Sequence, residues 1–151
     1  MIKIAILNLE NLDKLQYTLN CLEEIHKEII GVRIDMFIDK KNHEYIHDNK
    51  YINNIIPLDL NNINIFNFKS KYDSVNYYNK NKYHIAVDTQ GSLKSAFFNY
   101  QLTGKTAGFS QQGLLNKFIS NLYDEKVQLK SIIEKEEKTH ILLSKIFGFK
   151  S

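Results

Sequence analysis

The chain has 151 residues, of which 43% are hydrophobic and 25% are charged, and its formal net charge is +3 at pH 7. This length predicts one domain with its own hydrophobic core, and the positive charge is weaker than the basic bias of nucleic-acid-binding proteins, so we expect no nucleic-acid partner. No apolar run approaches the roughly 18 residues of a transmembrane helix and no signal peptide opens the chain, so we expect any membrane contact to be peripheral.

The beginning of the chain predicts a strand and then a helix. Ile2 to Leu7 is a short apolar run, as expected for a central strand. Leu12 to Ile29 repeats apolar residues at spacings of three and four, the pattern of an amphipathic helix that Gly31 would end. Cys21 lies within this helix and is expected to face the hydrophobic core of the domain. A lone cysteine fits a reducing cytoplasm.

The rest of the chain continues the alternation of strands and helices. Strands are predicted at Val32 to Ile38, Ile52 to Leu58, His84 to Val87 and Thr106 to Phe109, and helices at Asn42 to His47, around Lys94, at Leu114 to Tyr123 and at Ser131 to Phe147. This order predicts an α/β, Rossmann-like three-layer domain with a parallel sheet, spanning residues 1–151. The charge run Glu134 to Lys138 in the last helix is expected to form a solvated face.

The most informative segment lies between Tyr83 and Tyr100, where a strand passes through Asp88 into a helix that carries Lys94. Ligands in open α/β sheets gather where strands end and helices begin, and helix N-termini attract anions. This junction indicates a polar, anionic substrate. The alternative is that Asp88 only caps the helix and Lys94 is solvated.

Two other segments suggest chemistry. His43 to His47 reads HEYIH and matches the H-E-x-x-H zinc motif, but the helix is short and no third ligand is evident, so a zinc hydrolase is the weakest hypothesis. Ile63 to Tyr83 interleaves aromatic residues with lysines, which suits an anionic membrane surface or, alternatively, a polar segment with partly buried rings.

The first turn, Asn8 to Lys14, contains no glycine. It therefore cannot form the tight phosphate-binding turn of G-x-G-x-x-G, which argues against a dinucleotide-dependent oxidoreductase.

Val87 to Ala96, VDTQGSLKSA, resembles the D-x-Q-G-hydrophobic-x-K-S-A signature of the lipopolysaccharide heptosyltransferases, glycosyltransferase family 9. Weaker resemblances to other segments of the family occur along the chain in the same order as in the family, from Lys3–Leu7 to Ser144–Phe149. The resemblance covers nearly the whole chain but only the amino-terminal half of the usual enzyme. It implies the acceptor-side domain of a GT-B glycosyltransferase, with the donor-binding carboxy-terminal domain absent.

The resemblance implies inverting transfer of heptose from ADP-heptose to Kdo–lipid A, in the synthesis of the lipopolysaccharide or lipooligosaccharide inner core, with no cofactor or metal. The lipid-linked sugar acceptor would bind this domain at the cytoplasmic face of the inner membrane. The nucleotide-sugar donor would need the second domain. The chain alone is expected to be inactive, because it cannot also orient the leaving diphosphate.

The family's first turn carries a Gly-Asp pair whose aspartate takes the proton from the acceptor hydroxyl. A gapless alignment from Lys3 places Asp13 on the glycine and Lys14 on the aspartate, whereas a shift of one residue makes Asp13 the candidate base and leaves Leu12 in place of the glycine. Glu10 is the alternative base, and Asp13 could equally only support the helix start. The candidate acceptor-binding residues are Asp88, Gln90 and Lys94.

A second departure from the family is Leu115, at a position that usually carries an arginine for the acceptor's anionic groups. Lys105 and Lys117 are near, but a lysine lacks the two-pronged donor of arginine. The alternative hypothesis is therefore a non-catalytic remnant or interaction domain derived from such an enzyme.

Overall fold

The computed structural model describes residues 1–64, 66–67, 83–102, 105–110, 114–129 and 134–150, with the side chains of 114–116 left outside the description. The strands are β1 (Lys3–Asn8), β2 (Arg33–Asp39), β3 (Asn54–Leu58), β4 (Ile85–Asp88), β5 (Thr106–Ser110) and β6 (Glu125–Gln128). The helices are α1 (Leu12–Glu28), α2 (His43–Ile46), α4 (Leu93–Leu102), α5 (Leu114–Ser120) and α6 (Lys135–Phe147), and a 3-10 turn, η1 (Lys40–Asn42), precedes α2.

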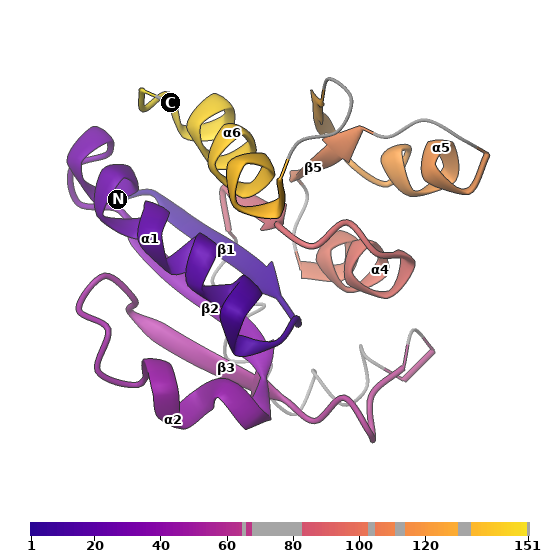
Figure 1. The fold of residues 1–151 in the computed structure, drawn as a ribbon, viewed down its shortest axis with the longest axis horizontal. Coiled ribbons are helices and arrows are strands. Elements are labelled where there is room, and N and C mark those ends of the chain that lie inside the picture. Colours follow the sequence, from indigo (N-terminus) through magenta and orange to yellow (C-terminus); the bar gives the residue numbers. More distant parts are fainter. Residues whose placement is uncertain (65, 68–82, 103–104, 111–113, 130–133, 151) are drawn as a thin grey trace.

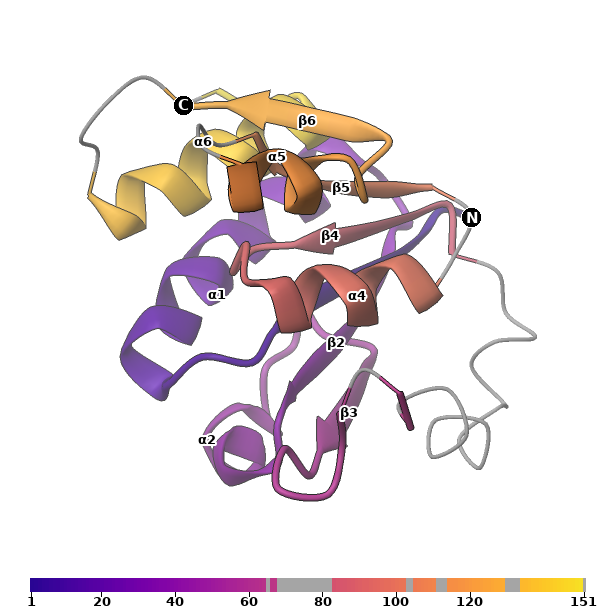
Figure 2. The ribbon, with the colours of Figure 1, turned by 90° about the vertical axis from the view of Figure 1, so that its right-hand side faces the viewer.

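The strands form one parallel sheet in the order β3-β2-β1-β4-β5-β6. Helices α1 and α6 pack side by side on one face of the sheet, while α4 and α5 cover the other (Figures 1 and 2). The predicted α/β three-layer fold with a parallel sheet is confirmed.

Strand β1 lies at the centre of this sheet and is buried on both sides. Ile4 and Ile6 belong to the core cluster beneath α1 and α6, whereas Ala5 and Leu7 belong to the cluster beneath α4. All four side chains are fully buried. This double burial explains why the strand reads as a continuous apolar run and does not alternate.

The predicted elements agree with the structure except near the carboxy-terminal end. The predicted helix Leu114 to Tyr123 ends at Ser120, and strand β6 follows it unpredicted. Strand β6 lies at the sheet edge and buries only Val127, so its sequence carries no clear strand pattern. Helix α6 begins at Lys135 with Glu134 as its N-cap residue, and residues 131–133 of the predicted range lie outside the described residues.

The long helices behave as their patterns predict. Cys21 is buried in the core formed by α1 and α6. Helix α6 ends at Gly148, which adopts the left-handed conformation with φ of 84° and donates its N–H to the Ser144 carbonyl. In the described part of the chain, none of the helices combines the length and apolar composition that crossing a bilayer requires.

Candidate functional site

The candidate site lies where the carboxyl ends of β1 and β4 meet. Leu7 of β1 pairs with Asp88 of β4, so the turns that follow the two strands are neighbours. The order of strands reverses between β1 and β4, because the chain first proceeds outward to β3 and then returns to the other side of β1. Such a switch point is where open α/β sheets bind ligands.

Side-chain amides hold these two turns together. Asn8 Nδ2 donates to Thr89 Oγ1 at 3.0 Å, and Asn8 Oδ1 accepts the Glu10 N–H at 3.1 Å. Gln90 Oε1 accepts the Leu9 N–H at 3.1 Å. These hydrogen bonds fix a first turn that has no glycine, by a network that the sequence motif did not reveal.

Glu10 lies between two lysines at this edge of the sheet. Its Oε2 is 3.4 Å from Lys135 Nζ and its Oε1 is 3.7 Å from Lys14 Nζ. Lys135 also donates to the carbonyls of Thr89 and Gln90, both at 3.3 Å. The Glu10 side chain is only 12% exposed, and its buried Oε2 accepts no hydrogen bond, so its contact with Lys135 is an ion pair alone.

Lys135 is the site residue that the sequence interpretation missed. It belongs to the charge run of α6 that was expected to be solvated, and this is wrong for Lys135, whose side chain is 27% exposed. The expectation holds for Glu134, Glu136 and Glu137, which are exposed. Lys135 opens α6, and α6 begins at the same edge of the sheet as α1 and α4.

Asp13 is an exposed residue in the first turn of α1. The capping hydrogen bond of this helix comes from Asn11, whose Oδ1 accepts the Lys14 N–H at 3.2 Å. The Asp13 carboxylate is therefore not needed as the cap, although its charge suits a helix N-terminus.

Asp88 is fully buried and accepts four hydrogen bonds. Its Oδ1 receives the N–H groups of Gln90 at 2.8 Å and Gly91 at 3.1 Å, and its Oδ2 receives the hydroxyls of Ser95 at 2.7 Å and Tyr123 at 2.6 Å. Burial raises the pKa of Asp88, while the four donors act in the opposite direction. In this conformation Asp88 organises the turn and has no exposed surface for a ligand.

Tyr123 reaches Asp88 across β5, and this path depends on Gly108. The Tyr123 ring lies so close to Gly108 that a methyl group there would overlap it. Burial and the neighbouring Asp88 raise the pKa of Tyr123, so its hydroxyl stays protonated and serves as a donor.

Gln90 and Lys94 are both partly exposed at the carboxyl edge of β4. Lys94 Nζ is 3.4 Å from the Leu60 carbonyl and 5.7 Å from the centre of the Phe98 ring. Of the sequence-predicted residues, the structure thus brings Asp13, Gln90 and Lys94 to one accessible edge and encloses Asp88 beneath it.

The sequence and the fold of the chain were compared with those of known proteins. No protein-family model matches the chain. The chain is 27% identical over 128 residues to lipopolysaccharide heptosyltransferase 1 of Campylobacter coli, which covers 84% of this chain and 36% of that protein. The chain is distantly similar to the lipopolysaccharide heptosyltransferases.

Solved structures of this heptosyltransferase group share the fold. E. coli heptosyltransferase WaaC with ADP superposes with a TM-score of 0.81 at 19% identity, over 99% of this chain and 48% of that chain. A glycosyl transferase family 9 protein from Veillonella parvula gives 0.78 at 17% identity, over 99% and 42%. The chain therefore spans less than half the length of these relatives.

The HEYIH segment forms α2, which follows the carboxyl end of β2. His43 and His47 are exposed, and His47 contacts its neighbours, with Nδ1 2.6 Å from the Glu44 carbonyl and Nε2 3.1 Å from Asp48. Among the described residues, no three His, Cys, Asp or Glu side chains are grouped to hold a metal ion. The HEYIH segment thus gains no support as a zinc site.

Two sequence interpretations fall largely on residues outside the description: the membrane-suited surface of Ile63 to Tyr83 and the departure from the family at Leu115. Most of the Ile63 to Tyr83 stretch and the side chain of Leu115 are not described. At the end of that stretch, Tyr83 is buried and donates its hydroxyl to Asp35 Oδ2 at 2.9 Å, so its ring is not available to a membrane.

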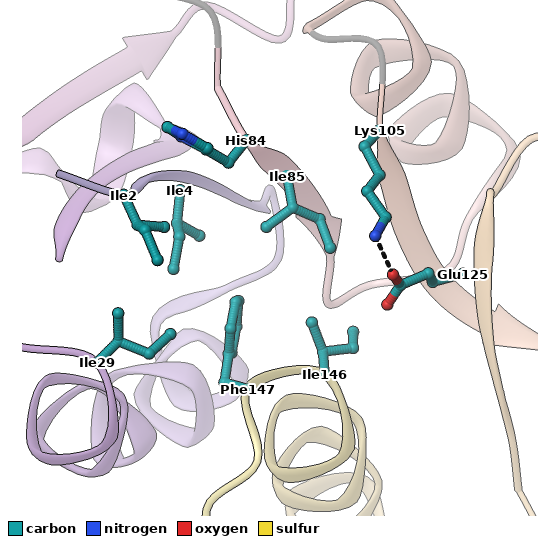
Figure 3. A pocket seen from close by; sticks show the side chains of 9 residues that line it. All are labelled: Ile2, Ile4, Ile29, His84, Ile85, Lys105, Glu125, Ile146 and Phe147. Carbon is teal, nitrogen blue, oxygen red and sulfur yellow. Dashed lines mark ion pairs between the residues drawn. The ribbon is translucent and has the colours of Figure 1, made fainter.

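A shallow cavity of about 200 Å³ lies at the opposite edge of the sheet (Figure 3). Its lining is mainly apolar, with isoleucines from β1, β4, α6 and the residues just before β1 and after α1, and with Phe147 of α6; the Lys105–Glu125 ion pair borders one side. No predicted site residue lines this cavity.

Proposed function

We propose that the chain is the acceptor-side domain of a heptosyltransferase-like glycosyltransferase. The reaction is the inverting transfer of heptose from ADP-heptose to Kdo–lipid A, in lipopolysaccharide or lipooligosaccharide inner-core synthesis at the cytoplasmic face of the inner membrane. The observation that carries this proposal is the polar edge at the β1–β4 switch point, in a chain similar to a Campylobacter coli heptosyltransferase. Donor binding requires a second domain.

Asp13 is the proposed general base. A base must lie within hydrogen-bond reach of the acceptor hydroxyl, directly or through one water. Asp13 is exposed at the edge, whereas Glu10 is held by Lys14 and Lys135. This difference in accessibility favours Asp13 over Glu10.

Lys94 is the proposed contact for the acceptor's anionic groups, with Gln90 beside it. Lys94 is the second residue of α4, so its ammonium and the helix N-terminus attract the same anion. Asp88 is proposed to act as a positioning residue, because it fixes the Gln90–Gly91 backbone that precedes α4.

The test joins this chain to the donor-binding half of the Campylobacter coli enzyme. The chimera is incubated with ADP-heptose and Kdo–lipid A, and the product is measured by mass spectrometry. We expect transfer by the chimera and none by the chain alone, because the latter cannot hold the leaving diphosphate. Efficient transfer by the chain alone would contradict the acceptor-domain proposal.

The base is then assigned by matched variants of the chimera. Asp13→Asn should lower kcat by about 10²- to 10⁴-fold, as loss of a general base does, while Glu10→Gln should have a smaller effect. The reverse order would make Glu10 the base. Binding of a Kdo oligosaccharide to the isolated chain, measured by NMR, gives an independent readout of acceptor binding. Lys94→Ala should weaken this binding, whereas Lys41→Ala should not.

A second candidate is a non-catalytic interaction domain. It is favoured by the first turn, where Leu12 replaces the family's glycine and the Glu10 carboxylate is already engaged by Lys135. A chimera carrying Leu12→Gly distinguishes the two candidates. Activity that appears only after this change supports the remnant, whereas equal activity with and without it shows that the departure is harmless.

A further inference from the structure

Helices α4 and α5 present an apolar, largely aromatic surface to the solvent. Leu93, Phe97 and Tyr100 recur along α4 at spacings of four and three, which places them on one side of the helix. Phe118 of α5 lies beside Phe97, with ring centres 6.1 Å apart. These four residues are called the α4–α5 face.

This face is distinct from the side of the helices that packs on the sheet. Helix α4 already buries Ala96, Phe98 and Leu102 in the core. On the α4–α5 face, by contrast, Leu93 is 36%, Tyr100 58% and Phe118 52% exposed. A helix that covers a sheet usually has a polar outer side, so the exposed rings of Tyr100 and Phe118, with partly exposed Phe97, indicate an interaction surface.

The segment of the chain that forms this face has a net positive charge. Residues 89–123, which include α4 and α5, contain Lys94, Lys105 and Lys117 and no aspartate or glutamate. The other 17 basic residues of the chain match its 17 acidic residues, so the net charge of +3 comes from this segment. Lys105 pairs with Glu125, and exposed Lys117 directly precedes Phe118.

We propose that the α4–α5 face docks on an anionic lipid bilayer. Aromatic rings favour the boundary between headgroups and acyl chains, and lysines beside them bind the anionic headgroups. Figure 2 shows α4 and α5 together on one outer layer of the molecule. Because α4 begins at the candidate site, docking brings Lys94 close to the membrane surface.

This inference rests on the proposed function, since a lipid-linked acceptor would be presented at such a surface. It extends that function by naming the surface that contacts the bilayer. The test uses neither sugar nor nucleotide, so its failure is distinguishable from failure of the transfer reaction.

The purified chain is sedimented with vesicles of phosphatidylethanolamine and phosphatidylglycerol, and with phosphatidylcholine vesicles. We expect binding to the anionic vesicles that weakens with salt and little binding to phosphatidylcholine. Lys117→Glu should lower the partition coefficient roughly tenfold or more, because it replaces an attractive charge with a repulsive one. The double variant Tyr100→Ser, Phe118→Ser should lower it by a similar factor.

Matched controls change exposed residues elsewhere. Ile30→Ser with Tyr45→Ser removes apolar side chains that are 94% and 71% exposed, and Lys145→Glu reverses a charge on α6, on the opposite side of the sheet. These variants should bind as the unaltered chain does. Absence of binding to anionic vesicles, or an equal loss in the controls, would overturn the proposal.

Self-association is the competing explanation of the exposed rings. Sedimentation velocity at several protein concentrations, without lipid, tests it directly. A monomer at all concentrations agrees with the proposal. A dimer that Phe118→Ser dissociates, together with no vesicle binding, would assign the face to a second copy of the chain.

Discussion

At the scale of single residues, the structure distinguishes the three carboxylates of the two turns by their burial and partners. Asp88 is enclosed with four donors, Glu10 is paired with lysines, and Asp13 is exposed. Their burial therefore indicates different roles: Asp88 shapes the turn, and Asp13 can reach a ligand. A carboxylate without surface area acts through the backbone that it holds.

Tyr123→Phe tests the enclosed carboxylate. The variant removes one of the four donors to Asp88 and leaves the buried oxygen less satisfied, so the free energy of unfolding should fall by about 1–3 kcal/mol. Urea denaturation followed by circular dichroism measures it. The control Tyr100→Phe removes a hydroxyl from an exposed ring and should change little. Equal effects of the two variants would show that the Tyr123 hydroxyl does not stabilise the fold.

At the scale of elements, β5 and the turn before β6 form a single unit with β4. Gly108 allows the Tyr123 ring to lie against β5, and the ring carries the hydroxyl to Asp88 at the end of β4. The single glycine of this short strand thus permits the hydrogen bond that stabilises the turn after β4. The turn that carries Tyr123 leads directly into β6, the strand that hydrophobic patterning does not predict.

Gly108→Ala should be strongly destabilising, because the new methyl group would overlap the buried Tyr123 ring. Overpacking of this kind costs about 1–3 kcal/mol or more. Gly31→Ala is the comparison: Gly31 has a φ of 74° but no atom within 4 Å of an added methyl, so only about 1 kcal/mol of backbone strain is expected. Thermal unfolding of both variants measures the difference, and a larger loss in Gly31→Ala would contradict the packing argument.

At the scale of the whole molecule, Lys135 links the closing helix to the first turn. Its ammonium contacts Glu10 after β1 and two carbonyls after β4, so α6 is tied to both strands of the switch point. The site is consequently completed only when the last part of the chain has folded onto the first.

A double-mutant cycle on Glu10 and Lys135 measures this link. Lys135→Met alone leaves the largely buried Glu10 carboxylate with only Lys14 as an ion-pair partner and should destabilise the chain. Glu10→Gln should recover part of the loss, giving a coupling energy of about 0.5–3 kcal/mol in urea denaturation. Lys138→Met on the same helix is the control. Strictly additive effects would show that the pair does not couple the two ends of the chain.

Much of the fold could be predicted from the sequence because hydrophobic periodicity is a local property. Strand β1 and helix α1 follow directly from a short apolar run and from spacings of three and four. Alternation of such elements leads to a parallel sheet. Strand β6 could not be predicted, since a short edge strand that buries only Val127 leaves almost no pattern.

The sequence by itself determined the order of the elements other than β6, the turn after β4 and the presence of acidic and basic residues around that turn, because neighbouring residues encode all of these. Only the tertiary structure decided that Asp88 is enclosed, that Tyr123 reaches it past Gly108, and that Lys135 belongs to the site. These properties arise from contacts between residues far apart in the chain, and burial exists only once the layers have packed.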